Sequence, residues 1–159
     1  RAKAEIVRNA VFLFHLLGYP RPKICVLSGK REINGDIPSY QDCLALKKAA
    51  AAGELGACEV MEATSFIDIF SPGKADFRLR DTRIGGTDFP HIMLVPNLAT
   101  GNILVKLDFA LKNVRRRSLV MSSRGPVIIP SRSDFRDSIL GEIAAGVTVA
   151  EQIKGGAAS

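Results

Sequence analysis

The sequence contains no tryptophan, and aromatic residues make up only 6% of its 159 residues. Few aromatics, and the absence of zinc-finger, basic-zipper or aromatic RNA-binding motifs, disfavour a nucleic-acid-binding domain. No apolar run reaches the ~18 residues of a membrane-spanning helix. The longest candidate, residues 10–18, is interrupted by His15. No secretory signal pattern is visible. We therefore expect no nucleic-acid partner and no membrane partner.

Cysteine is scarce and irregularly spaced, since the chain has only Cys25, Cys43 and Cys58. An odd number without a C-x-x-C pair argues against a disulfide framework or a zinc site. Each cysteine has apolar neighbours, which predicts buried free thiols. This pattern favours the reducing cytoplasm and predicts no metal.

Several catalytic motifs are absent as well. The sequence has no dinucleotide-binding glycine motif, phosphate-binding Walker loop, H-E-x-x-H pair or G-x-S-x-G elbow. His15 and His91 lie far apart in apolar segments, without a serine or cysteine partner at a suggestive spacing. We expect both histidines to be structural.

The composition that remains is that of one ordinary globular domain, with 47% hydrophobic and 24% charged residues. The net charge of +6 is concentrated in one window. Residues 112–136 contain seven basic residues and one acid, Asp134. The net charge of this window therefore equals the net charge of the whole chain. This window predicts affinity for an anion, and a phosphorylated small molecule fits better than nucleic acid. Because the chain begins at Arg1 without Met, we also expect a missing upstream piece.

Apolar runs alternate with helical periodicity along the chain, which predicts an α/β fold with a mostly parallel sheet and helices on both faces. We expect one domain over residues 1–154 and a flexible tail over 155–159. Expected helices cover residues 2–17, 40–52, 65–70 and 98–113, and a last helix follows Ser133 or Asp134; expected strands cover 23–27, 57–61, 91–95, 118–122 and 127–129.

Local signals set the ends of these elements. Gly18 is a natural stop for the first helix, and Ser39 is a candidate N-cap for the second. Ser133 or Asp134 is expected to cap the last helix, which should turn Ile139, Ile143 and Val147 inward. Residues 71–90 have no clear period and are expected to form a long surface loop, and residues 123–126 a turn.

Two strand-to-helix junctions could hold a ligand, because ligands of open α/β sheets bind beyond the carboxyl ends of the strands. At the first junction, Thr100 and Gly101 allow close backbone approach, and Asn102 can donate and accept hydrogen bonds. A simple loop with a helix cap explains this junction equally well.

The second junction, residues 129–134, combines two hydroxyl groups, a guanidinium and a carboxylate at one helix entrance. Arg132 could grip phosphate, and Ser131 could hydrogen-bond a developing oxyanion. Asp134 or Asp137 could act as a base, although helix capping alone would explain both acids. Residues 115–117, three arginines, are expected at the end of a helix, or else near a nucleotide phosphate.

Five segments in order resemble the C-terminal half of the phosphate acetyltransferase and phosphate butyryltransferase family. The G-N-I-L-x-K and S-R-x-D blocks are the most specific of them. The segments are residues 3–10 (KAEIVRNA); 26–28 (VLS) with 33–34 (IN) and 37–39 (IPS); 91–96 (HIMLVP); 100–106 (TGNILVK); and 126–134 (PVIIPSRSD).

The resemblance implies an enzyme that transfers a short acyl group between coenzyme A, a substrate here, and inorganic phosphate. It implies a two-lobed fold like that of isocitrate and isopropylmalate dehydrogenases, and usually a homodimer. Residues 1–154 would then supply one full lobe and the strand and helix that return to the other. The form of the S-R-S-D block looks closer to the butyryl branch.

The resemblance also implies roles for individual residues. Ser131 would hydrogen-bond the reacting centre, Arg132 would hold phosphate, and Asp134, with Asp137 as the fallback, would help to deprotonate the thiol. Substrate-binding residues of the other block would be Thr100, Gly101, Asn102 and Lys106.

Departures from the family pattern keep a second function open. A family D-G-P-type block is replaced by residues 60–68, and Asn97 stands where an acid is usual. These departures favour the alternative of a non-catalytic regulatory module that binds coenzyme A or an acyl phosphate.

Overall fold

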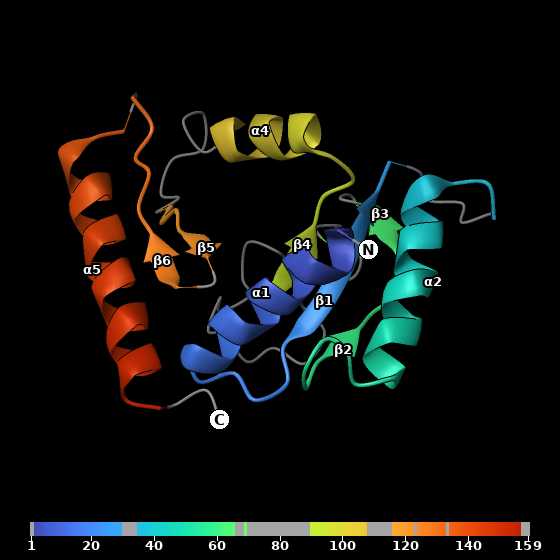
Figure 1. The fold of residues 1–159 in the computed structure, drawn as a ribbon. Helices are drawn as coiled ribbons and strands as arrows, with labels where there is room; N and C mark the ends of the chain where they lie inside the picture. Colours follow the sequence, from blue (N-terminus) through green and yellow to red (C-terminus); the bar gives the residue numbers. More distant parts are fainter. Residues whose placement is uncertain are drawn as a thin grey trace.

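The computed structural model describes residues 2–29, 35–65, 69, 90–107, 116–122, 124–132 and 134–156. The described residues contain both helices and strands, interspersed along the chain (Figure 1). The elements are α1 (Ala2–Leu16), β1 (Lys23–Ser28), α2 (Pro38–Ala51), β2 (Glu59–Val60), β3 (Thr64–Ser65), β4 (Ile92–Leu94), α4 (Leu98–Lys106), β5 (Val120–Ser122), β6 (Gly125–Val127) and α5 (Arg136–Lys154).

The main sheet is organised around β1, and all its pairings are parallel. One edge of β1 pairs first with β2, from Lys23 and Ile24, and then with β3, from Leu27 and Ser28. The other edge pairs with β4 over residues 24–26. The expectation of an α/β fold with a parallel sheet is confirmed.

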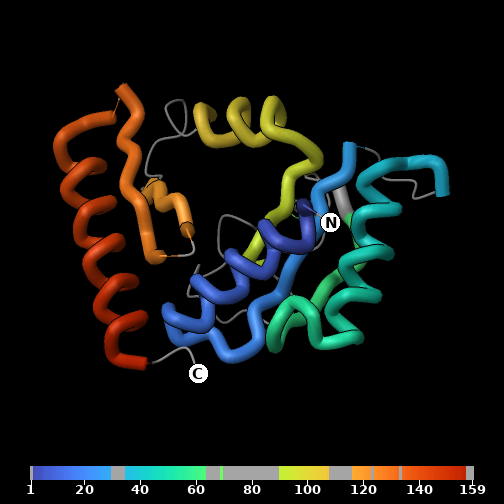
Figure 2. The backbone as a smooth tube through the Cα atoms, viewed as in Figure 1, coloured from blue at the N-terminus to red at the C-terminus, as the bar shows by residue number. Residues whose placement is uncertain are grey.

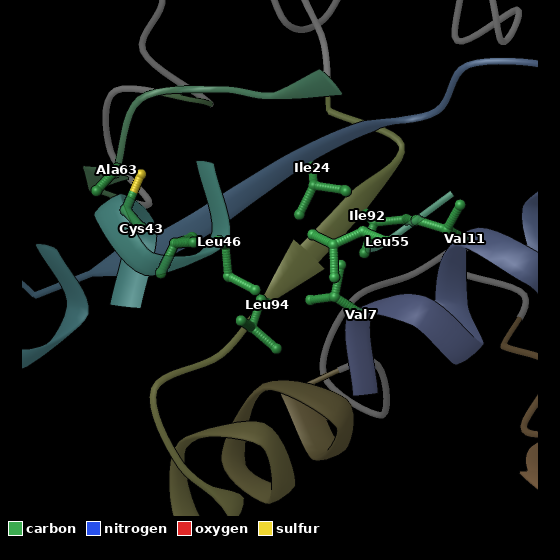
Figure 3. Close-up of a cluster of buried hydrophobic side chains, with 10 residues drawn as sticks. Val7, Val11, Ile24, Cys43, Leu46, Leu55, Ala63, Ile92 and Leu94 are labelled. Atoms are coloured by element: carbon green, nitrogen blue, oxygen red, sulfur yellow. The ribbon is translucent and has the colours of Figure 1, made fainter. Parts of the chain in front are cut away.

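The hydrophobic core lies between this sheet and the helices α1 and α2 (Figure 3). Side chains alternate along a strand, so every second residue of β1 and β4 points into this cluster. Cys25 and Leu27 point to the opposite face of β1 and are also buried, so both faces of this strand are covered. The cluster contains Val7, Val11, Ile24, Val26, Cys43, Leu46, Leu55, Ala63, Ile92 and Leu94.

Both histidines have structural contacts, as the sequence predicts. The His15 Nε2 atom lies 2.8 Å from the Ala57 carbonyl oxygen. The His91 Nδ1 atom accepts a hydrogen bond of 3.0 Å from the backbone N–H of Lys23. The His91 ring packs edge-to-face against the rings of Phe14 and Tyr19, with centroids 6.2 and 5.1 Å away. These contacts join the end of α1 to the start of β4.

A second layer is formed by the antiparallel β5–β6 hairpin and α5, which packs against β6 and α1. The helix comes so close to the hairpin that a Cβ atom on Gly146 would lie 2.7 Å from the Ile128 Cδ1 atom. Gly125 and Pro126, expected in a turn, belong to β6 and pair with β5.

The predicted inward face of α5 is wrong. Ile143 and Val147 are exposed, whereas the buried residues of α5 are Glu142, Gly146 and Val149. Close approach to the hairpin selects small residues at the contact, and apolar periodicity does not report this selection.

The predicted cap of α2 is wrong as well. The helix begins with Pro38 after Ile37, and Ser39 is buried with its hydroxyl donating to the Ser28 hydroxyl at 3.0 Å. Proline suits the first helical position because its missing N–H would have no partner there. Ser65, expected to start a short helix, lies in β3, and most of residues 66–70 and the expected loop over 71–90 lie outside the described residues.

The carboxyl ends of β1 and β4 point toward one end of the molecule. Figure 2 shows that α4 and the segment joining β6 to α5 both lie at this end. The sequence predicts ligand binding there. Among the described residues, no helix is both long enough and apolar enough to span a membrane.

Candidate functional site

The residues before α5 form a tight turn that closes on itself. The backbone N–H of Asp134 donates to the Ser131 carbonyl at 3.0 Å. The Asp134 carboxylate returns to accept the Ser131 backbone N–H, with 2.6 Å between nitrogen and Oδ2. A short hydrogen bond to an ionised acceptor is among the stronger kinds. The two bonds therefore fix the backbone on both sides of Arg132.

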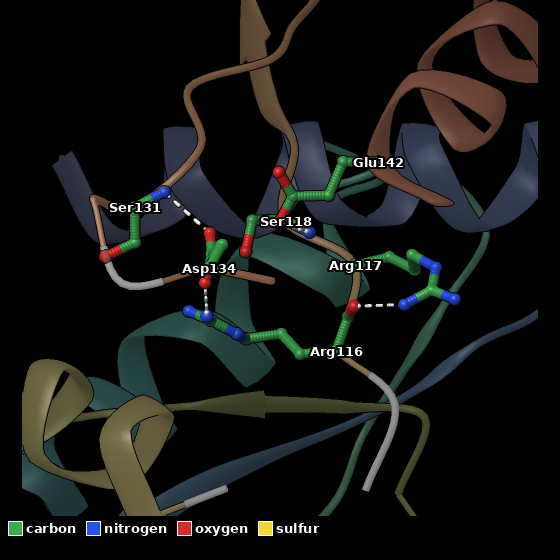
Figure 4. Close-up of polar contacts among 6 residues, drawn as sticks. All are labelled: Arg116, Arg117, Ser118, Ser131, Asp134 and Glu142. Carbon is green, nitrogen blue, oxygen red and sulfur yellow. Dashed lines mark hydrogen bonds and ion pairs between the residues drawn. The ribbon is translucent and has the colours of Figure 1, made fainter. Parts of the chain in front are cut away.

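Arg116 fixes the other oxygen of the same carboxylate. Its Nη2 atom forms a hydrogen bond and ion pair with Oδ1 of Asp134 (Figure 4). The Asp134 side chain is only 2% exposed, and the Arg116 side chain is 22% exposed. A buried carboxylate needs such partners, because an unpaired buried charge is strongly unfavourable. Asp134 thus joins the turn to the segment that leads into β5.

Asp134 does not cap α5, which corrects the sequence-based prediction. The N-cap residue is Phe135, which has no side-chain capping bond, and the other candidate, Ser133, lies outside the described residues. Asp137 lies in the first turn of α5 and is exposed. An acid at this position is favourable next to the positive end of the helix dipole.

Ser131 and Arg132 are exposed on the closed turn. The turn therefore presents a hydroxyl and a guanidinium to the surroundings from a backbone held by Asp134. Arginine can bind a phosphate group through two parallel hydrogen bonds. This arrangement can hold an anion.

The segment behind the turn contains contacts that the sequence did not reveal. Arg116 and Arg117, expected at a helix end, lie in a segment without regular secondary structure that leads into β5. The Arg117 Nη1 atom donates to the Arg116 carbonyl at 2.7 Å. Its guanidinium also occupies the space above Gly141, where an added Cβ would lie 2.0 Å from Nε.

Glu142 is the other residue that sequence reasoning missed. It is fully buried on α5, and its Oε1 atom accepts the backbone N–H of Ser118 at 3.2 Å. Its Oε2 atom has no hydrogen-bond partner within the described part of the chain. The only sign of this residue in the sequence is an acid among the apolar residues of a helix. Such an acid could equally be exposed to solvent.

The junction at α4 is a capped helix start. The Asn97 side chain accepts the backbone N–H of Thr100 at 2.9 Å, and the Thr100 hydroxyl donates to the same oxygen at 3.1 Å. The backbone N–H of Thr100 is therefore occupied by the cap. Gly101 lets the helix approach the preceding loop, because an added Cβ would lie 3.2 Å from Cγ2 of Val95.

Asn102 and Lys106 are exposed on α4. Figure 1 places α4 and the turn before α5 at the same end of the molecule, on separate elements. Hydrogen bonds fix each group separately: Asn97 fixes the start of α4, and Asp134 fixes the turn.

The cysteines do not have the properties of a catalytic nucleophile. Cys25 and Cys43 are buried, as predicted, whereas Cys58 is half-buried, and all three are free thiols. Burial raises the pKa of the Cys43 thiol and that of the Cys58 thiol. A raised pKa lowers the thiolate fraction at neutral pH, so neither thiol is activated. Within the described ranges, no group of three metal-ligating residues comes together.

The chain is similar in sequence to known acyltransferases. It is 27% identical over 151 residues to the phosphate butyryltransferase of Clostridium acetobutylicum, an alignment that covers 94% of this chain and 49% of the relative. It is 29% identical over 133 residues to the phosphate acetyltransferase of Rhizobium meliloti, which covers 84% of this chain and 42% of the relative. Both similarities support a relationship to the phosphate acetyltransferase and butyryltransferase family.

A solved structure shares the fold of this chain. The structure matches a branched-chain phosphotransacylase from Enterococcus faecalis V583 with a TM-score of 0.73, 23% sequence identity and coverage of 92% of this chain and 52% of that chain. No family model matches the chain. The chain spans about half the length of the curated relatives it matches.

Proposed function

We propose that this chain is part of a phosphate acyltransferase that transfers an acetyl or butyryl group between coenzyme A and inorganic phosphate. The sulfur of coenzyme A attacks the carbonyl carbon of the acyl phosphate, the bond from carbon to the phosphate oxygen breaks, and phosphate leaves. The observation that carries the proposal is the closed turn that exposes Ser131 and Arg132. Similarity to acyltransferases along most of the chain supports the reaction class.

Ser131 and Arg132 act on the reacting groups in this proposal. The Arg132 guanidinium binds the phosphate oxygens and balances the negative charge that builds up in the transition state. The Ser131 hydroxyl donates to the carbonyl oxygen. Their backbone is fixed before substrate arrives, so little ordering accompanies the reaction.

The two aspartates have different parts in the proposal. Asp134 is nearly inaccessible and both of its oxygens have partners, so we assign it the positioning of the turn. Asp137 is exposed and is the second residue of α5. We therefore assign it as the base that removes the thiol proton.

The residues of α4 complete the proposed substrate site. Thr100, Gly101, Asn102 and Lys106 line the side of the site opposite the turn and contact the substrates. The exposed amide of Asn102 and ammonium of Lys106 suit anionic groups. Coenzyme A is a substrate here, and residues 1–154 contribute one lobe and the returning strand and helix of the other.

The test is a pair of arginine variants. Arg132→Ala should lower acyl transfer about 100-fold or more with the fold intact, because it removes the phosphate-binding cation. Arg124→Ala is the matched control, since Arg124 is also exposed but sits in the β5–β6 turn. Thiol loss is measured on mixing coenzyme A with acetyl or butyryl phosphate, and phosphate binding by calorimetry.

The outcomes separate the candidate functions. Loss of transfer in Arg132→Ala alone supports the acyltransferase. Equal transfer in both variants overturns the role of Arg132. Binding of coenzyme A or acyl phosphate without any transfer favours the regulatory module.

The proposal includes a homodimer in the cytoplasm. Three free cysteines suit a reducing compartment. The helix α4 has no buried residue and exposes Leu98, Ile103 and Val105. Exposed apolar side chains gathered on one element are typical of an interface, and we take a second copy of the chain as the partner.

A further inference from the structure

Glu142 is buried in a position that is unfavourable for a carboxyl group. One oxygen accepts the Ser118 backbone N–H at 3.2 Å, and the other has no partner among the described residues. Burying a polar atom without a hydrogen bond costs free energy. An apolar residue would fill the same space without this unfavourable free energy. We therefore expect the role of Glu142 to lie in the hydrogen bond that it accepts from Ser118.

That hydrogen bond fixes a segment with a second attachment. Ser118 directly follows Arg117, whose guanidinium lies against Gly141, next to Glu142 in α5. Arg116, one residue further back, binds the Asp134 carboxylate. Residues 116–118 are therefore held by α5 at one end and by the Ser131–Asp134 turn at the other (Figure 4).

The contacts form a continuous chain from Glu142 to the turn. Glu142 holds the backbone of Ser118, the short segment carries Arg116, Arg116 holds Asp134, and Asp134 holds the Ser131 N–H. Arg132 extends from the turn so fixed. The Arg116–Asp134 pair is largely buried, so its geometry is sensitive to small backbone displacements.

We propose that Glu142 is a positioning residue for anion binding: by anchoring residues 116–118 to α5 it keeps Arg116 on Asp134 and so keeps the turn that presents Arg132. The proposal deepens the proposed function and depends on it for the identity of the ligand, phosphate. The connection from Glu142 to Ser131 does not depend on that ligand.

The first experiment compares three folded variants by calorimetry with inorganic phosphate. Glu142→Met removes the acceptor of the Ser118 N–H and should weaken phosphate binding about tenfold. Glu142→Gln keeps a carbonyl oxygen at that place and should bind as the parent chain does. Val149→Ala also alters the buried face of α5, about two turns away, and should leave phosphate affinity unchanged.

The second experiment asks whether Glu142 acts through Arg116. Arg116→Met alone should weaken phosphate binding, and the double variant Glu142→Met/Arg116→Met should be no weaker than Arg116→Met. Effects that multiply in the double variant would mean that the two residues act independently, which overturns the proposal.

A third readout does not need the ligand. The amide proton of Ser131, donated to the Asp134 carboxylate, gives an NMR signal, and Asp134→Ala, which removes the acceptor, sets the position of that signal without the hydrogen bond. Glu142→Met should move the signal toward that position, whereas Glu142→Gln and Val149→Ala should not. An unmoved signal in folded Glu142→Met overturns the proposal. If the parent chain binds no phosphate, the proposed function fails, and this signal still decides the role of Glu142.

Discussion

Asp134 and Glu142 are both nearly inaccessible carboxyl groups, but they are held differently. Asp134 has a partner for each oxygen, the Ser131 N–H and the Arg116 guanidinium. Glu142 has one, the Ser118 N–H. Loss of Asp134 would remove an ion pair with Arg116 and the hydrogen bond from the Ser131 N–H, whereas loss of Glu142 would remove one hydrogen bond, that from the Ser118 N–H. At the scale of single residues, Asp134 belongs to the recognisable S-R-x-D block of the candidate site, and Glu142, which we propose as a positioning residue, lies outside that block.

The cysteines give a pH dependence at the same scale. Burial raises the pKa of Cys43 above its ordinary value of 9.0, so this thiol ionises in the unfolded chain before it ionises in the folded one. Its contribution to stability is full below the unfolded pKa and is lost as pH rises toward the folded pKa.

We expect the free energy of unfolding to fall from about pH 8 to about pH 10, and to fall less steeply in Cys43→Ala. Urea titrations across this range measure the change. The comparison with Cys43→Ala is needed because other groups also titrate near pH 10. Equal slopes in the two proteins would exclude Cys43 as the source.

At the scale of elements, the sequence predicted what depends on neighbours along the chain. The helix α1 and its stop at Gly18, which has φ +88°, follow from periodicity and from the freedom of glycine in that conformation. The strand β1 follows from a short apolar run. The face of α5 was predicted wrongly because close packing against the hairpin depends on Gly146, which has no hydrophobic signal.

Two valines of α5 test this face directly. Val149 is 1% exposed, and Val147, expected inward from the sequence, is 56% exposed. Val149→Ala should lower the free energy of unfolding by about 2 kcal/mol, because two buried carbons are lost. Val147→Ala should change it by less than about 0.5 kcal/mol.

Helix propensity favours alanine equally at both positions, so the difference between the two variants reports burial alone. Chemical denaturation of both variants measures it. A larger decrease in the free energy of unfolding for Val147→Ala would support the buried face of α5 that periodicity predicts.

At the scale of the whole molecule, topology predicts where a ligand would bind, and this position stays a prediction. Parallel strands bring their carboxyl ends to one end of the fold, and both predicted ligand groups lie there. The contacts of Arg116 and Glu142 could not be predicted, because they join positions 18 and 24 residues apart in the chain. Sequence spacing carries no signal for such pairs.

The assembly can be tested at this scale. The chain in solution should have about twice its mass of 17.1 kDa if α4 is covered by a second copy. Ile103→Lys should yield a monomer, because a charge would replace an exposed apolar side chain at the contact. Val147→Lys is the matched control on α5. Light scattering measures the mass, and an unchanged dimer in Ile103→Lys would place the contact elsewhere.

The central place of β1 has a consequence for how this fold can vary. Each parallel pairing in the described sheet is made to β1, and β2, β3 and β4 form none with one another. A substitution within one of these three strands acts directly on a single pairing with β1. A shift of β1 by one residue would turn Ile24 and Val26 out of the core and displace three neighbours together. Substitutions can therefore accumulate on the outer strands one at a time, while β1 can change only in step with all of them.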